Sequence, residues 1–220
     1  MQQRQAFDIA LKELKWKLLR MGGDIQEAIR RAIAALETQD TALAQAVVDG
    51  DANINGQDHD VEDLCIRLIA TQQPVAGDLR RIVAGMRLAM DLERMGDLAV
   101  DIAKSVLRMG AAPSAQAWED IRAMAKMVDA MIAEALNAYV DSDVEAAKRL
   151  AQMDDEIDHH YRHLVEQLFS RSTSTSENTT TPQAMATAFC GRYLERIGDH
   201  VTNIGESVIY IISGERSDLN

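Results

Sequence analysis

The sequence predicts an all-α protein built as two tandem three-helix bundles, six long antiparallel helices in all, related by an internal duplication. Aromatic residues make up only 4% of the 220 residues and there are only three prolines, which is typical of long helices packed on aliphatic side chains. The stretch LERMGD at 92–97 returns as LERIGD at 194–199. A period of about 100 residues indicates a duplicated domain, because solenoid repeats are shorter.

Apolar periodicity and turn signals predict where each helix begins and ends. The expected helices are 4–37, 40–70, 75–108, 115–140, 143–170 and 182–213. Asp40 and Ser142 are predicted N-caps, and Pro74 and Pro182 are predicted to open the third and sixth helices, where proline is tolerated. The polar segment 170–183 is predicted to be a mobile loop.

The two halves align without a gap over their most similar stretch. Residues 92–108 and 194–210 are identical at 8 of 17 positions, and 51–55 aligns with 154–158. Each half is therefore expected to fold as one three-helix bundle. The predicted domains are 1–110 and 111–220.

Composition excludes several classes of protein. A formal net charge of −12 argues against nucleic acid as a partner and suits cations or a basic protein surface. No stretch of about 18 apolar residues occurs, so the chain is not expected to be embedded in a membrane. Cys65 and Cys190 lie in no CxxC motif, which favours a reducing cytoplasm over a disulfide framework.

The repeated stretch carries an acidic stripe along one helix face. Residues four apart turn by about 400°, so members at i, i+4 and i+8 stay on one side of the helix. The stripe consists of Glu93, Asp97 and Asp101 in the first copy and of Glu195, Asp199 and Asn203 in the second. Like charges at this spacing cost roughly 0.2–0.5 kcal/mol per pair, so a compensating positive charge is expected.

Two compensators remain open at this point. One is a solvated face on which Arg94 and Arg196 pair with the carboxylates, a weak interaction. The other is a bound cation, because stacked carboxylates can bridge hard or borderline metals. Further ligands would then come from the preceding helix of each half: Asp51, Asn55 and Asp58 in the first, Asp154 and Asp158 in the second.

The repeated glycines and the histidines have plainer alternatives. Gly96 and Gly198 each cost about 1 kcal/mol in mid-helix, which predicts close approach of a neighbouring helix, either to reach the stripe or simply to pack. Asp155, His159 and His163 form another i, i+4, i+8 row. A single E-x-x-H is too few for a di-iron bundle, so exposed polar residues are the default.

The longer motifs resemble the PhoU family of accessory regulators of phosphate transport. The resemblance is carried by RMGGDIQEAI (20–29), AVVDGDANIN (46–55), CIRLIATQQPVAGDLRRI (65–82), LERMGDLAVDIAKS (92–105) and AFCGRYLERIGDHVTNIGESVIYIISG (188–214). It implies two tandem three-helix bundles in a cytoplasmic homodimer or higher homo-oligomer. It also implies a non-enzymatic adaptor between the ATPase subunit of the phosphate ABC transporter and a sensor histidine kinase, restraining phosphate-starvation signalling.

The resemblance also implies sites. Multinuclear iron or zinc would be held by the two acidic stripes, with Asn203 departing from a pure carboxylate pattern in the second. The stretch containing Asp78, Arg80 and Arg81 becomes a candidate partner surface. The alternative from another class is a metal-dependent enzyme or metal store, although no nucleophile–base signature, P-loop or dinucleotide fingerprint is present.

Overall fold

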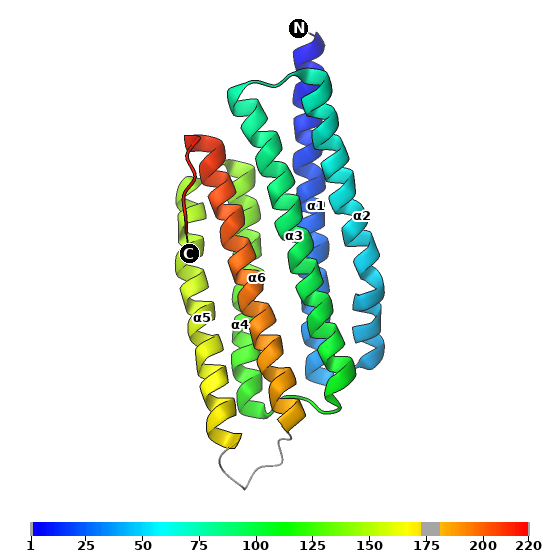
Figure 1. Cartoon of the computed structure of the whole chain (residues 1–220), viewed down its shortest axis with the longest axis vertical. Helices are drawn as coiled ribbons and strands as arrows, with labels where there is room; N and C mark the ends of the chain where they lie inside the picture. Colours follow the sequence, from blue (N-terminus) through cyan, green and yellow to red (C-terminus); the bar gives the residue numbers. More distant parts are fainter. Residues whose placement is uncertain (1, 173–180, 220) are drawn as a thin grey trace.

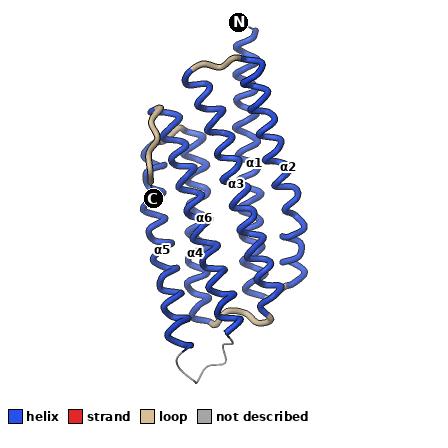
Figure 2. The backbone as a smooth tube through the Cα atoms, in the orientation of Figure 1, coloured by secondary structure: helices blue, strands red, loops and turns tan. Residues whose placement is uncertain are grey.

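The computed structural model describes residues 2–172 and 181–219, and every regular element within those ranges is an α-helix (Figure 1, Figure 2). The helices are α1 (Gln2–Thr38), α2 (Thr41–Gln72), α3 (Ala76–Met109), α4 (Ala115–Asp141), α5 (Val144–Ser172) and α6 (Thr181–Ser213). The first three pack on one another as one bundle and the last three as a second. The predicted fold class is confirmed, while the exact domain boundaries stay a prediction. None of the described helices combines the length and apolarity needed to cross a bilayer.

Capping decides two of the boundaries. Asp40 is the N-cap of α2, as predicted, because its Oδ1 accepts bonds from the Ala42 amide at 3.0 Å and the Leu43 amide at 2.9 Å. The prediction for Ser142 is wrong by one residue. Ser142 adopts a left-handed φ of 56° that ends α4, and the carboxylate of Asp143 caps α5 instead.

The predicted mobile loop at 170–183 is longer than the gap between the helices. Helix α5 continues to Ser172 and α6 begins at Thr181, while the rest of that segment, 173–180, lies outside the described residues. Pro182 occupies the first turn of α6 as expected. Pro74 instead precedes Val75, the N-cap of α3, and therefore lies just outside its helix.

The core repeats between the halves. Leu18, Met21 and Ile29 of α1 are buried, and the residues 103 positions later in α4 are buried too. Full burial of such a side chain stabilises the fold by about 1.5–3 kcal/mol. Each bundle therefore closes its own apolar centre in the same register.

The two bundles pack side by side through α3 and α6, which run in opposite directions, with α1 against α4 behind them (Figure 1). Asn203 of α6 donates from Nδ2 to Asp91 Oδ1 of α3 at 3.0 Å. The residues 102 positions away, Asp101 of α3 and Tyr193 of α6, also lie near each other. Their proximity shows in the pKa of Tyr193, which is raised by burial and then by the carboxylate of Asp101. The same interhelical contact is thus made twice, about an approximate two-fold axis.

Candidate functional site

Four carboxylates gather in the second half, two from α5 and two from α6. They are Asp154, Asp158, Glu195 and Asp199. Burial, followed by repulsion from Asp199, raises the pKa of both Asp154 and Glu195 to about 7. Burial and then Asp199 also raise the pKa of Asp158. The structure therefore brings the sequence-predicted Glu195 and Asp199 together with the two ligands expected from α5. This group is called the second-half cluster below.

Two oxygens of the second-half cluster are buried without a hydrogen-bond partner among the described residues. They are Asp154 Oδ1 and Glu195 Oε2. Glu195 is paired through its other oxygen with Arg192, and its side chain is only 10% exposed. A buried carboxylate oxygen without a donor is costly while the group is ionised, so these two oxygens favour either a bound proton or a cation.

The repeated glycines allow the close approach that the sequence predicts. A Cβ at Gly198 would lie 2.5 Å from Asp154 Oδ1, so a carboxylate of the cluster rests against the α6 backbone. A Cβ at Gly96 would lie 3.1 Å from a methyl carbon of Ile54. Gly198 thus makes room for the acidic group itself, whereas Gly96 serves ordinary helix packing.

The equivalent first-half cluster contains three carboxylates and one amide: Asp51, Asn55, Glu93 and Asp97. Asn55 donates from Nδ2 to Asp51 Oδ2 at 3.1 Å, while Asp51 Oδ1 and Asn55 Oδ1 are buried without partners among the described residues. Burial, and then Asp97, raises the pKa of Glu93. Arg94 lies 3.1 Å from Asp97 and 3.5 Å from Glu93, so the ion-pair compensator is present in this half.

The third member of each predicted stripe lies apart from its cluster. Asn203 is hydrogen-bonded to Asp91 across the α3–α6 interface, and Asp101 pairs with Lys104 at 3.7 Å. Each step of four residues turns the helix by about 40° beyond a full revolution, and two steps carry these residues away from their clusters. Asp58 also lies near the first cluster, where its charge contributes to raising the pKa of Glu93.

Two histidines of α5, only one of them from the predicted row, contact a carboxylate of α4. His163 Nδ1 lies 3.0 Å from Asp120 Oδ2 of α4, and His160 Nδ1 lies 3.0 Å from Asp120 Oδ1. Gln167 donates to the same carboxylate at 3.1 Å. Sequence reasoning missed this group because its acceptor, Asp120, lies on another helix, about 40 residues before the histidines, and is only 5% exposed.

The donor chemistry of both clusters suits a divalent cation. Their buried, unpartnered oxygens are the ligands that hard and borderline metals prefer. As the side chains stand, no three His, Cys, Asp or Glu residues in ranges 2–172 and 181–219 converge to chelate one ion. Metal binding at these clusters therefore stays a prediction, and would require carboxylates to move toward one another.

The candidate partner surface at the start of α3 has contacts within the chain. Asp78 lies in the first turn, as expected, and accepts from Arg4 Nη1 at 2.7 Å. Arg80 packs over Gly214, where a Cβ would lie 3.0 Å from its guanidinium. The side chain of Arg81 is 54% exposed and pairs with Asp78 at 3.4 Å. Arg81 is the member best placed to meet a partner.

Comparison with known proteins matches both halves of the chain. A family model described as the PhoU domain matches residues 18–106 and again 121–208. A phosphate-specific transport system accessory protein PhoU homolog from Clostridium acetobutylicum is 38% identical, covering 99% of each chain. The phosphate-specific transport system accessory protein PhoU of Escherichia coli K12 is 30% identical, covering 95% of this chain and 86% of its own.

Solved structures resemble the whole molecule. The phosphate transport system regulatory protein PhoU from Streptococcus pneumoniae aligns with a TM-score of 0.88 at 31% identity, covering 96% of this chain and 99% of its own. PhoU from Pseudomonas aeruginosa also has a TM-score of 0.88, at 32% identity, covering 95% and 100%. The likeness therefore extends over both bundles and their packing.

Proposed function

Because the chain belongs to the PhoU family, we propose that it regulates phosphate transport. The observation that carries this proposal is the near end-to-end match to a protein named as a phosphate transport accessory protein. Since both bundles are matched, the proposal concerns the whole chain and not one shared domain.

In finer detail, we propose a cytoplasmic, non-enzymatic adaptor that forms homodimers or higher homo-oligomers. It would contact the ATPase subunit of the phosphate ABC transporter and a sensor histidine kinase, restraining starvation signalling when phosphate is plentiful. A net charge of −12 supports docking onto basic protein surfaces. The exposed guanidinium of Arg81 supplies a local charge of the opposite sign.

Deletion of the gene in its host tests the regulatory role. A phosphate-starvation reporter should become active in phosphate-rich medium, and the wild-type chain should restore repression. Full repression without the protein would contradict the proposal. Co-purification with the ATPase subunit and the kinase tests the adaptor role, with Arg81→Gln expected to weaken capture and Arg67→Gln, an exposed arginine on α2, as the matched control.

We also propose that each cluster holds a divalent cation, iron or zinc. In the first half Glu93 and Asp97 would bind it with Asp51 and Asn55. In the second half the ligands would be the four carboxylates of the second-half cluster. A bound cation would add positive charge to that of Arg94 and Arg192, which each pair with carboxylates of one cluster, and the surrounding side chains would hold its ligands in place.

Thermal melting tests the metal proposal. Zinc or iron at a hundredfold excess over its dissociation constant should stabilise the wild type by about 2.7 kcal/mol for each occupied site. Asp97→Asn combined with Asp199→Asn should abolish the rise in melting temperature. Asp63→Asn combined with Asp141→Asn, two exposed carboxylates outside both clusters, should retain it. If no divalent metal raises the melting temperature of the wild type, the metal proposal is wrong, while the proposed regulatory role is unaffected.

One observation favours a second function, a metal-dependent enzyme. Carboxyl groups with a pKa of about 7, as at Asp154 and Glu195, are suited to general acid–base catalysis near neutral pH. Phosphatase and oxidase assays on the metal-loaded protein distinguish the enzyme from the non-enzymatic adaptor. Turnover that disappears in Glu195→Gln would support the enzyme over the adaptor.

A further inference from the structure

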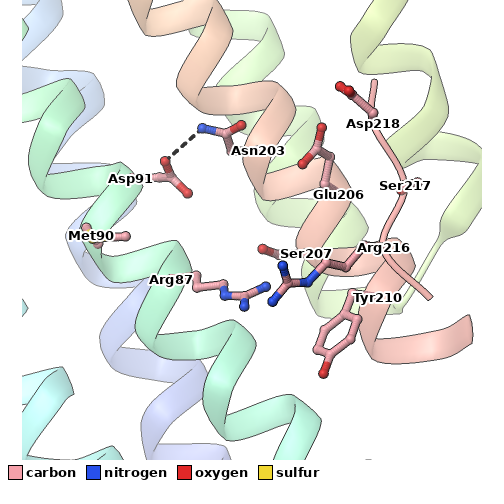
Figure 3. A pocket seen from close by; sticks show the side chains of 10 residues that line it. All are labelled: Arg87, Met90, Asp91, Asn203, Glu206, Ser207, Tyr210, Arg216, Ser217 and Asp218. Atoms are coloured by element: carbon pink, nitrogen blue, oxygen red, sulfur yellow. Dashed lines mark hydrogen bonds between the residues drawn. The ribbon is translucent and has the colours of Figure 1, made fainter. Parts of the chain in front are cut away.

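A pocket of about 590 Å³ lies between α3, α6 and the segment that follows α6 (Figure 3). It is separate from both carboxylate clusters and is lined by side chains of opposite charge. Arg87 projects from α3, and Arg216 comes from the C-terminal segment. Three acidic side chains also line it: Asp91, Glu206 and Asp218.

The two arginines form the basic end of the pocket. Figure 3 shows their guanidinium groups directed toward one another, with Ser207 beside them. Within the part of the chain that the structure describes, neither Arg87 nor Arg216 has a carboxylate within ion-pair distance. Arg87 instead lies over the ring of Tyr210, 5.7 Å from its centroid. Two facing positive charges with no carboxylate within ion-pair distance are an arrangement that an anion would stabilise.

Two of the three lining carboxylates each use one oxygen in contacts within the chain. Asp91 Oδ1 accepts from Asn203 Nδ2 and lies 3.0 Å from His200 Nδ1. Glu206 Oε1 accepts from the backbone amide of Leu219 at 3.0 Å. A hydroxyl is also available, because Ser217 Oγ lines the same pocket region, is buried and has no hydrogen-bond partner among the described residues.

We propose that this pocket binds a small phosphoryl oxyanion, held between the guanidinium groups of Arg87 and Arg216. Guanidinium forks match tetrahedral oxyanions with paired N–H donors, and two of them facing each other can hold oxygens from both sides. The volume leaves room beyond the anion itself. The ligand class therefore includes inorganic phosphate and small phosphate monoesters.

The acidic wall gives a reason to prefer phosphate over sulfate. Near neutral pH inorganic phosphate keeps a proton and can donate a hydrogen bond, whereas sulfate can only accept. Asp91 Oδ2 has no donor among the described residues and can accept such a bond. Sulfate in the same place would face a carboxylate that repels it.

Calorimetric titration of metal-free protein with inorganic phosphate tests the proposal, using buffers stripped of divalent ions so that cluster-bound metal cannot bind the anion. Arg87→Gln and Arg216→Gln should each weaken binding by at least about tenfold, since each removes a charge-assisted contact. Arg67→Gln removes the same charge from an exposed site on α2 and should leave the affinity unchanged. Arg216 lies beyond the last helix, so its variant folds even if the α3 variant is perturbed.

Two further arms of the titration decide the ligand. Sulfate at the same pH and ionic strength should bind at least about tenfold more weakly than phosphate. Glycerol phosphate, if bound more tightly than inorganic phosphate, identifies a monoester as the ligand; weaker binding identifies the free anion. The proposal would be overturned if neither phosphoryl ligand saturated the protein. It would also be overturned if Arg67→Gln weakened binding as much as the pocket variants do, or if sulfate bound as tightly as phosphate.

Discussion

The two carboxylate clusters occupy equivalent places in the duplicated fold but differ at one ligand. The first half has Asn55 where the second, 103 positions later, has Asp158. The amide of Asn55 donates to Asp51, while a carboxylate at that position can only add charge. In the second half burial, then Asp199, and in addition Asp158 raise the pKa of Asp154 and Glu195 to about 7.

The difference teaches how burial, together with one added carboxylate, changes the competition between protons and cations. Metal ligands must be deprotonated, so any cation entering the second half has to displace protons near neutral pH. In the first half Arg94 contacts both Glu93 and Asp97, whereas in the second Arg192 pairs with Glu195. A cation therefore competes with an arginine for two ligands in the first half and for one in the second. The same backbone therefore presents two sites with different obstacles to binding.

The largest expected effect is on the pH dependence of stability. Asp154 and Glu195 have folded pKa values of about 7, above their unfolded values of about 4, so the folded state holds more protons between these limits. Their stabilising contribution is complete below about pH 4 and is lost as pH rises through 7. The loss is on the order of 3 kcal/mol, after allowance for solvent screening.

Denaturant unfolding of metal-free protein between pH 5 and 8 measures this loss. Asp154→Asn with Glu195→Gln should reduce the dependence of the free energy of unfolding on pH relative to wild type. The matched first-half variant, Asp51→Asn with Glu93→Gln, should change this pH dependence less. If both double variants reduce this pH dependence equally, the clusters do not differ as described.

A second contrast concerns the first two helices of each half, α1 with α2 and α4 with α5. In the first half Lys17 of α1 lies 3.1 Å from Asp60 of α2. At the equivalent positions of the second half Asp120 of α4 faces His163 of α5, so the acidic side chain lies on the other helix of the pair. Asp120→Ala should destabilise the protein by about 2 kcal/mol, because it removes a buried acceptor shared by His160, His163 and Gln167.

Asp60→Ala is the matched control. Its side chain is 67% exposed, so the loss of its ion pair should cost below about 1 kcal/mol. Urea denaturation compares the two variants directly. Equal destabilisation would mean that burial of Asp120 adds nothing to its contacts.

The features that were predictable from the sequence are those that depend on local pattern. Helix periodicity and the repeat gave the fold class, and the same repeat located Glu93 and Glu195. The Asp143 cap was missed because the preceding serine and this aspartate are both good caps, and only the backbone turn at Ser142 decides between them. Asn203 was placed on the stripe by spacing, while its partner Asp91 lies on a helix from the other half.

Exchanging the differing ligand sharpens the comparison of the clusters. Asp158→Asn should lower the pKa of Asp154 and Glu195 and stabilise the metal-free protein at pH 8 by about 1 kcal/mol, because one repelling charge is gone. Asn55→Asp should destabilise it by a similar amount. Thermal melts at pH 8 measure both, and changes of the same sign in the two variants would refute the assigned roles.

The smallest expected effect separates the two repeated glycines. Alanine gains about 1 kcal/mol of helix propensity at either position, which offsets steric cost. At Gly96 the new Cβ meets methyl carbons of Ile54 at 3.1 Å and 3.2 Å, which need shift only slightly, so stability should change by below about 0.5 kcal/mol and the pH curve not at all.

At Gly198 the new Cβ meets Asp154 Oδ1 at 2.5 Å, so that carboxylate must swing away from the α6 backbone. Its burial would fall, and burial is the main cause of its raised pKa. Gly198→Ala should therefore change total stability by below about 1 kcal/mol while reducing the loss of stability between pH 5 and 8. The same denaturant series measures it. A pH curve changed by Gly96→Ala and unchanged by Gly198→Ala would show that the glycine contact does not hold Asp154 in its buried place.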